Sequence, residues 1–141
     1  MSPYRSILVG LGPAASWDAA LAHAVWLARR DGARLTVLLA AGSLPATVWL
    51  APGLPGDLDR ELTAACERRR RAVVSALPQD MSVTTIVRRG DLRRALLGEV
   101  RSGAHDLVIV GRRSATSRWP WRDRAGRALL RRSPVPLLVA A

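Results

Sequence analysis

The chain has 141 residues, of which 49% are hydrophobic, and it carries a formal net charge of +11 at pH 7. This length suits one domain that buries its own core, so we expect residues 1–141 to form a single domain. The sequence starts without the marks of a signal peptide, and no apolar stretch reaches the roughly 18–20 residues of a membrane helix. A single cysteine, Cys66, fits a reducing compartment. We therefore expect a cytoplasmic protein without a membrane partner.

All 22 basic residues are arginines. The exclusion of lysine indicates a bias toward GC-rich codons, so local charge is a better guide to function than total charge. The segment 112–132 holds eight arginines and one acid, Asp123, for a local net charge of +7. A field of this kind attracts phosphates, acidic proteins or nucleic acid.

Strands and helices alternate along the chain, as hydrophobic periodicity and capping residues indicate. In chain order we predict a strand over 5–11, a helix over 16–31, a strand over 34–41, a helix over 57–77, a strand over 82–88, a helix over 91–102, a strand over 107–110, a helix over 123–132 and a strand over 136–140. Ser16 and Asp91 are expected N-caps, and Gly32 is an expected C-cap. The second strand is apolar almost throughout, which is typical of a parallel strand covered on both faces. This alternation predicts a parallel sheet between two helical layers.

The helix over 57–77 follows a long connection. Residues 42–56 are rich in glycine and proline, and a connection of this length is often a lid, a binding loop or a disordered segment. The inner stripe predicted for the helix consists of Leu62, Cys66, Val73 and Leu77. Arg69 falls on the same stripe, where its stem can lie on apolar surface while its head reaches water.

Few residues are suited to catalysis. The chain has two histidines and 11 acids, and none of them show the spacing of a metal site or of a nucleophile with its base. His23 is expected on an exposed helix face and Cys66 in the core, while His105 and Asp106 are expected in a turn with a local hydrogen bond. We therefore expect a protein that is not an enzyme and has no metal site.

Five phrases of the sequence, in order and spacing, resemble the universal stress protein family over nearly the whole chain. They occupy residues 5–9, 33–39, 89–91, 103–111 and 133–139. The resemblance implies an α/β fold, a single-domain Rossmann-like three-layer sandwich with a five-stranded parallel sheet in the order 3-2-1-4-5. It also implies a homodimer through the C-terminal strand, because that strand lies at the sheet edge in the family and an apolar edge invites pairing.

Many members of this family bind ATP through an aspartate after the first strand and a glycine-rich loop after the fourth. In this sequence the aspartate position holds Gly12, and Gly111 matches the first loop glycine. The second loop glycine is replaced by Ser114, and the final Gly-Ser pair falls on Asp123-Arg124. A Cβ at the serine narrows the approach of a phosphate, and an acid at the helix start repels one. These departures imply that ATP binding is weak or absent.

Arginines could replace the glycine amides as anion ligands, because a guanidinium binds phosphate through paired hydrogen bonds. The candidate ligand-binding residues are Gly10, Gly12, Gly111, Arg112, Arg113, Ser114 and Arg124. No cofactor is assigned, and ATP remains an open alternative. A stacking platform for bases at Trp119-Pro120-Trp121 is a further alternative, but we expect these tryptophans to cover the sheet end or a subunit contact, without nucleic acid as a partner.

The sequence therefore predicts a small, non-catalytic universal stress protein that serves in stress-response binding or regulation, with weak or absent ATP binding. Two alternatives stay open. One is a nucleotide-dependent switch of the same family. The other is a basic adaptor for nucleic acid or an acidic protein.

Overall fold

A computed structural model describes residues 4–11, 18–40, 54–88, 92–111 and 131–140. Its elements, in chain order, are β1 (Ser6–Leu11), α1 (Asp18–Asp31), β2 (Arg34–Ala40), α3 (Leu54–Ala76), β3 (Val83–Arg88), α4 (Leu92–Ser102), β4 (Leu107–Gly111) and β5 (Leu137–Ala140). Every predicted strand is confirmed to within one residue at each end. Ser16, Asp91 and most of the helix predicted over 123–132 lie outside the described residues.

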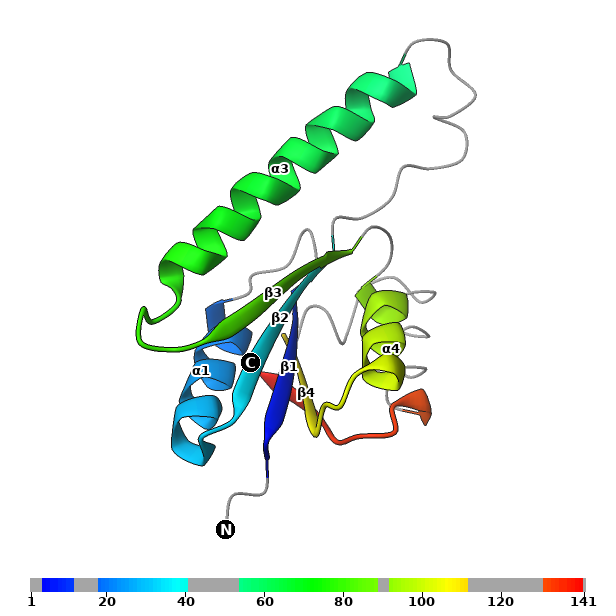
Figure 1. Ribbon diagram of the computed structural model, residues 1–141. Coiled ribbons are helices and arrows are strands. Elements are labelled where there is room, and N and C mark those ends of the chain that lie inside the picture. The colour runs from blue at the N-terminus through cyan, green and yellow to red at the C-terminus, as the bar shows by residue number, and fades with distance from the viewer. Residues whose placement is uncertain (1–3, 12–17, 41–53, 89–91, 112–130, 141) are drawn as a thin grey trace.

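The five strands form one parallel sheet in the order β3-β2-β1-β4-β5 (Figure 1). β1 lies at the centre, with Val9 opposite Val37 of β2 on one side and opposite Ile109 of β4 on the other. All the residues of β1 and β4 are buried, as expected for strands covered on both faces. The predicted Rossmann-like α/β sandwich is therefore confirmed, including its strand order.

Two hydrophobic clusters separate the helices onto opposite faces of the sheet. One cluster joins Ile7, Val9 and the other side chains of that face to α1 and to the last turns of α3. The other joins Leu8, Leu38, Val108 and Val110 to α4. Because successive side chains of a strand point to opposite faces, the continuous apolar runs supply both clusters at once. Figure 1 shows α1 and α4 on opposite sides of the strands.

The end of α1 follows the predicted pattern. Gly32 has φ of 65°, the left-handed conformation that glycine adopts at a helix C-cap without the penalty of a side chain. The amide of Ala33 donates to the carbonyl of Ala28 at 2.9 Å. The chain then reverses directly into β2.

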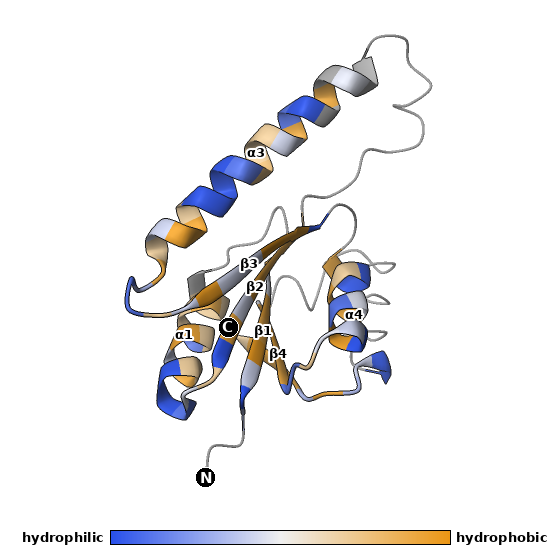
Figure 2. Cartoon of the chain, in the orientation of Figure 1, coloured by the Kyte–Doolittle hydropathy of each residue, from blue (hydrophilic) through white to orange (hydrophobic). Residues whose placement is uncertain are grey.

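Helix α3 begins at Leu54, three residues earlier than predicted, and reaches beyond the sheet. Its 23 residues span about 35 Å at 1.5 Å per residue, whereas the 6 residues of β3 span about 20 Å. Val73 and Leu77 are in the core, but Leu62, predicted on the same inner stripe, is only half-buried. Figure 2 shows apolar residues interspersed with hydrophilic ones along the first half of the helix.

Candidate functional site

The direction of the chain changes at the centre of the sheet. From β1 the chain moves outward through β2 to β3, and β4 then pairs with the other side of β1 before β5. In open parallel sheets a ligand crevice lies beyond the carboxyl ends of the two strands where this switch occurs. Here those ends carry Gly10 and Leu11 on β1 and Gly111 on β4.

The structure brings two of the predicted site residues together. Gly10 is paired with Val110, so Gly111 is the next residue of β4 at the same edge of the sheet. The other candidates, Gly12, Arg112, Arg113, Ser114 and Arg124, lie outside the described residues, as do Trp119 and Trp121. The described part of the site is therefore its floor, formed by the ends of β1 and β4.

Gly10 has a packing role that its position in the sequence did not reveal. A Cβ built at this residue would lie 2.7 Å from Cδ2 and 2.8 Å from Cδ1 of Leu96. Leu96 is fully buried on α4 and belongs to the cluster on that face of the sheet. The missing side chain of Gly10 thus lets α4 approach β1 closely, independently of any ligand.

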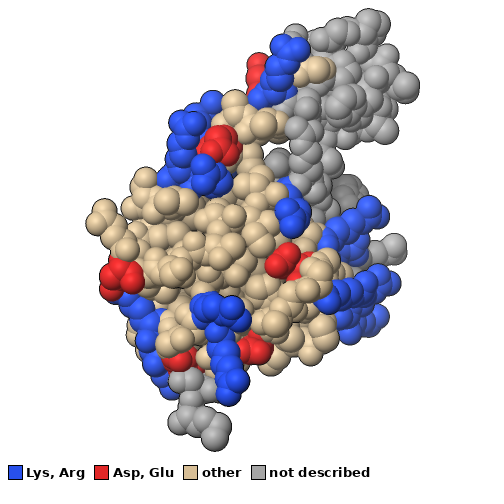
Figure 3. All heavy atoms as spheres, viewed as in Figure 1, with Lys and Arg blue, Asp and Glu red and all other residues tan. Residues whose placement is uncertain are grey.

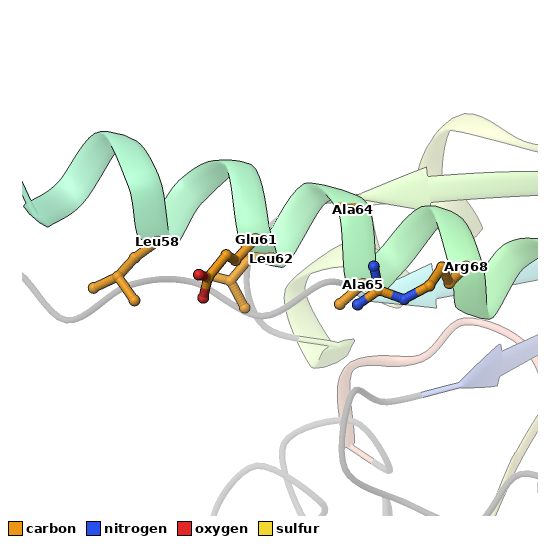
Figure 4. A pocket seen from close by; sticks show the side chains of 6 residues that line it. All are labelled: Leu58, Glu61, Leu62, Ala64, Ala65 and Arg68. Carbon is orange, nitrogen blue, oxygen red and sulfur yellow. The ribbon is translucent and has the colours of Figure 1, made fainter.

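A cavity of about 560 Å³ lies against the first half of α3. It is lined by Leu58, Glu61, Leu62, Ala64, Ala65 and Arg68 (Figure 4). The leucines give it an apolar wall, and Glu61 and Arg68 add one charge of each sign. Sequence reasoning missed this cavity. The signal in the sequence that could have indicated it was the length of the predicted helix, which exceeds the length of the neighbouring strand.

A buried polar network lies at the other end of the sheet, near the amino termini of β1 and β4. His105 Nδ1 is 3.1 Å from Ser6 Oγ, and its Nε2 is 3.1 Å from Glu99 Oε1. The side chains of His105 and Glu99 are 7% and 16% exposed. A Cβ at Gly103 would lie 2.7 Å from His105 Nε2, so the glycine leaves room for the ring.

The turn predicted to join His105 and Asp106 by a local hydrogen bond is organised differently. Asp106 Oδ2 accepts the backbone amides of Arg5 at 2.6 Å and Ser6 at 3.0 Å. Both side chains therefore hold residues about 100 positions away in the chain. Because Ser6 is only 5% exposed, a substrate has little access to its hydroxyl group, and the row of Ser6, His105 and Glu99 joins β1 to α4.

The electrostatics of α3 are set by burial and by one ion pair. Burial raises the pKa of the Cys66 thiol and lowers the pKa of the Arg69 guanidinium, since both charged forms lose hydration. A hydrogen bond from Arg70 lowers the pKa of Glu67. The Arg70 Nε to Glu67 Oε1 distance is 2.9 Å. The buried, protonated Cys66 agrees with the predicted inert core residue.

No group of three or more His, Cys, Asp or Glu side chains in the part of the chain that the structure describes is placed to hold a metal ion. No helix among those described residues is long and apolar enough to span a membrane.

The strand order, which reverses at β1, defines an open, doubly wound α/β domain. The family model of the universal stress proteins matches residues 3–141, so the chain belongs to the universal stress protein family. None of the curated proteins matches the sequence significantly.

Solved structures of the same family share the fold. A universal stress protein from Burkholderia pseudomallei has 21% identity and a TM-score of 0.74, over 99% of this chain and 97% of that one. A universal stress protein in complex with cAMP has 20% identity and a TM-score of 0.60, over 99% and 98% of the two chains. A family protein from Arabidopsis thaliana with AMP bound has 11% identity and a TM-score of 0.64, over 96% and 90%.

Proposed function

We propose that this chain is a non-catalytic, cytoplasmic regulatory protein of the stress response whose crevice beyond β1 and β4 holds an adenine nucleotide only weakly. The observation that carries the proposal is the position of Gly111, which we match to the first glycine of the family's nucleotide loop, at the carboxyl end of β4 where the strand order reverses. Two structural relatives support the ligand class, because one was solved with cAMP and another with AMP.

Weak affinity follows from the residues that replace the family pattern. Gly12 offers no carboxylate to a nucleoside hydroxyl group. Ser114 carries a Cβ where a glycine would let phosphate approach the backbone, and Asp123 adds a negative charge. The neighbouring arginines attract an anion without replacing these specific contacts. We therefore expect the phosphate groups to contribute more than the base to binding.

Isothermal titration with ATP, ADP, AMP and cAMP tests the proposal. We expect dissociation constants of about 1 mM or weaker, equivalent to about −4 kcal/mol. Gly12→Asp restores the family carboxylate and should tighten nucleotide binding about tenfold, as one charge-assisted hydrogen bond allows. Ala104→Asp is the matched control, because it adds the same charge at an exposed position beside the amino end of β4. Micromolar binding of ATP by the unaltered chain would contradict weak affinity, and no binding even by Gly12→Asp would remove nucleotides as ligands.

We also propose that two copies pair through β5. This strand bonds only to β4 in the described sheet, and its Val139 is 44% exposed. An apolar edge strand of this kind favours pairing with a second copy. Val139→Arg should give the mass of one chain in light scattering, whereas the unaltered protein should give the mass of two. Val74→Arg is the matched control on α3, where Val74 is 46% exposed. A single-chain mass for the unaltered protein would refute this pairing.

A further inference from the structure

The exposed side of helix α4 carries two arginines and a glycine. Arg94, Gly98 and Arg101 are exposed and follow one another at intervals of four and three residues, so they share one side of the helix. The opposite side carries Leu96, Leu97 and Val100, which are buried against the sheet. The outer side thus consists of two arginines separated by a residue without a side chain.

Two more arginines come from the end of the chain. Arg131 and Arg132 are helical and exposed. Shortly after them, Val135 packs against the same cluster as the buried residues of α4. Figure 1 shows residues 131–132 beside α4, and Figure 3 shows basic side chains gathered on this side of the molecule. We call Arg94, Gly98, Arg101, Arg131 and Arg132 the α4 basic face.

Arg101 lies in the last turn, where the helix dipole favours a cation, but helix stability does not explain Arg94, the other exposed arginine of α4. The first turn of the helix has no acidic residue but contains Arg93 and Arg94, and the positive end of the helix dipole disfavours cations there. Glu99, the acid within α4, lies 3.1 Å from His105 Nε2 with its side chain 16% exposed, and so does little to neutralise the outer arginines. The charges of the exposed Arg94 and Arg101 remain available to a partner.

Gly98 is the second unusual feature of this surface. A glycine inside an exposed helix costs stability relative to alanine. A Cβ at Gly98 would meet nothing within 4 Å, so the packing of the domain does not require a glycine there. The bare backbone between Arg94 and Arg101 instead lets a partner approach the helix closely.

From these observations we propose that the α4 basic face binds the phosphate backbone of nucleic acid without reading its sequence. The class of partner follows from the lack of exposed large apolar side chains on this face. The large apolar side chains exposed in the described residues are Trp26, Val74 and Val139, none of which belongs to α4. Protein interfaces need an apolar centre and membrane-surface helices need an apolar side, whereas phosphate contacts need only well-placed cations.

The proposal predicts a specific salt dependence. If each of the four arginines neutralises one phosphate, the logarithm of the binding constant should fall against the logarithm of the salt concentration with a slope of about −3.5. A fluorescein-labelled 20-base-pair DNA duplex of random sequence, followed by anisotropy, is a suitable probe. Arg94→Ala with Arg101→Ala should reduce the slope by about 2 and weaken binding at least about tenfold at 0.1 M salt.

The matched control removes the same charge elsewhere. Arg68→Ala with Arg71→Ala alters two exposed arginines of α3, and it should leave the slope within about 0.5 of that of the unaltered protein. Gly98→Glu places a carboxylate between Arg94 and Arg101 and should also abolish most of the binding. Excess AMP should not displace the duplex, which separates this face from the nucleotide crevice.

Three results would overturn the proposal. They are equal losses in the α3 and α4 double variants, displacement of the duplex by AMP, and tighter binding of polyglutamate or of phosphatidylserine vesicles than of the duplex. Equal losses would mean that net charge alone accounts for binding of the duplex. Displacement by AMP would place the duplex in the nucleotide crevice. Tighter binding of polyglutamate or of the vesicles would assign the face to an acidic protein or to a membrane.

Discussion

The contact between Gly10 and Leu96 can be tested by adding one carbon atom. In Gly10→Ala, the new Cβ would lie 2.7 Å from Leu96 Cδ2 unless something moves. Leu96 is 0% exposed, so its side chain has little room to turn away. Overpacking of a buried core costs about 1–3 kcal/mol. We expect Gly10→Ala to lower the free energy of unfolding by an amount in this range.

A double-mutant cycle identifies the cause. Leu96→Ala alone should cost about 2–5 kcal/mol, because it leaves a cavity. In the double variant the Cβ added by Gly10→Ala enters the space that the leucine vacates, so the combined loss should be smaller than the sum by about 1 kcal/mol or more. Urea unfolding followed by circular dichroism measures all four proteins, and an unchanged m-value shows that the transitions are comparable.

The control is a second glycine-to-alanine change, on the helix that carries Leu96. At Gly98 the added Cβ meets nothing within 4 Å, and alanine favours the helix over glycine by up to about 1 kcal/mol. Gly98→Ala should therefore stabilise the fold, whereas Gly10→Ala destabilises it. If Gly10→Ala were neutral, or if its cost simply added to that of Leu96→Ala, the packing role of Gly10 would be wrong.

Three further predictions concern Asp106 and helix α3. Asp106→Ala should lower the free energy of unfolding by about 2–3 kcal/mol in urea, because it leaves the amides of Arg5 and Ser6 without their charged acceptor. A typical hydrogen bond contributes about 1 kcal/mol, so a loss below about 0.5 kcal/mol would contradict this role of Asp106. The raised pKa of Cys66 means that the folded state holds the thiol proton more tightly, so stability should decline above about pH 8.5, and Cys66→Ala should remove that decline. A thiol reagent at pH 8 should label Cys66 only in denaturant, and rapid labelling of the folded protein would refute its burial. Val73→Ala should cost about 2 kcal/mol and Leu62→Ala less than about 1 kcal/mol, because only Val73 is fully buried; equal costs would show that both halves of α3 are docked.

The two ends of the sheet have different construction. At the amino ends of β1 and β4, Asp106 and His105 join the start of β4 to β1 through hydrogen bonds. At the carboxyl ends, Gly10 and Gly111 carry no side chain and lie beside Leu11, the last residue of β1. Ligands of open α/β sheets bind beyond the carboxyl ends of the strands, so the hydrogen-bonded amino ends lie opposite the candidate site.

The sequence alone predicted β1, β2 and β4 because their apolar runs need burial on both faces, and a parallel sheet is the structure that provides it. It also predicted the end of α1, since the left-handed conformation at Gly32 is a local property of the backbone. The strand order followed from the resemblance to the family. These features depend on near neighbours in the chain or on a pattern spread over all of it.

Other features were decided only by the tertiary structure. The role of Gly10 depends on Leu96, and the partners of His105 and Asp106 lie at Ser6 and Arg5, about 100 residues away. The first half of α3 is partly exposed because the sheet ends before the helix does, and the residues of the helix do not indicate where the sheet ends. Contacts of this kind form only after the strands have paired, because pairing decides which side chains far apart in the sequence lie next to each other. The sequence gives the residues but not the distances between them in the folded chain.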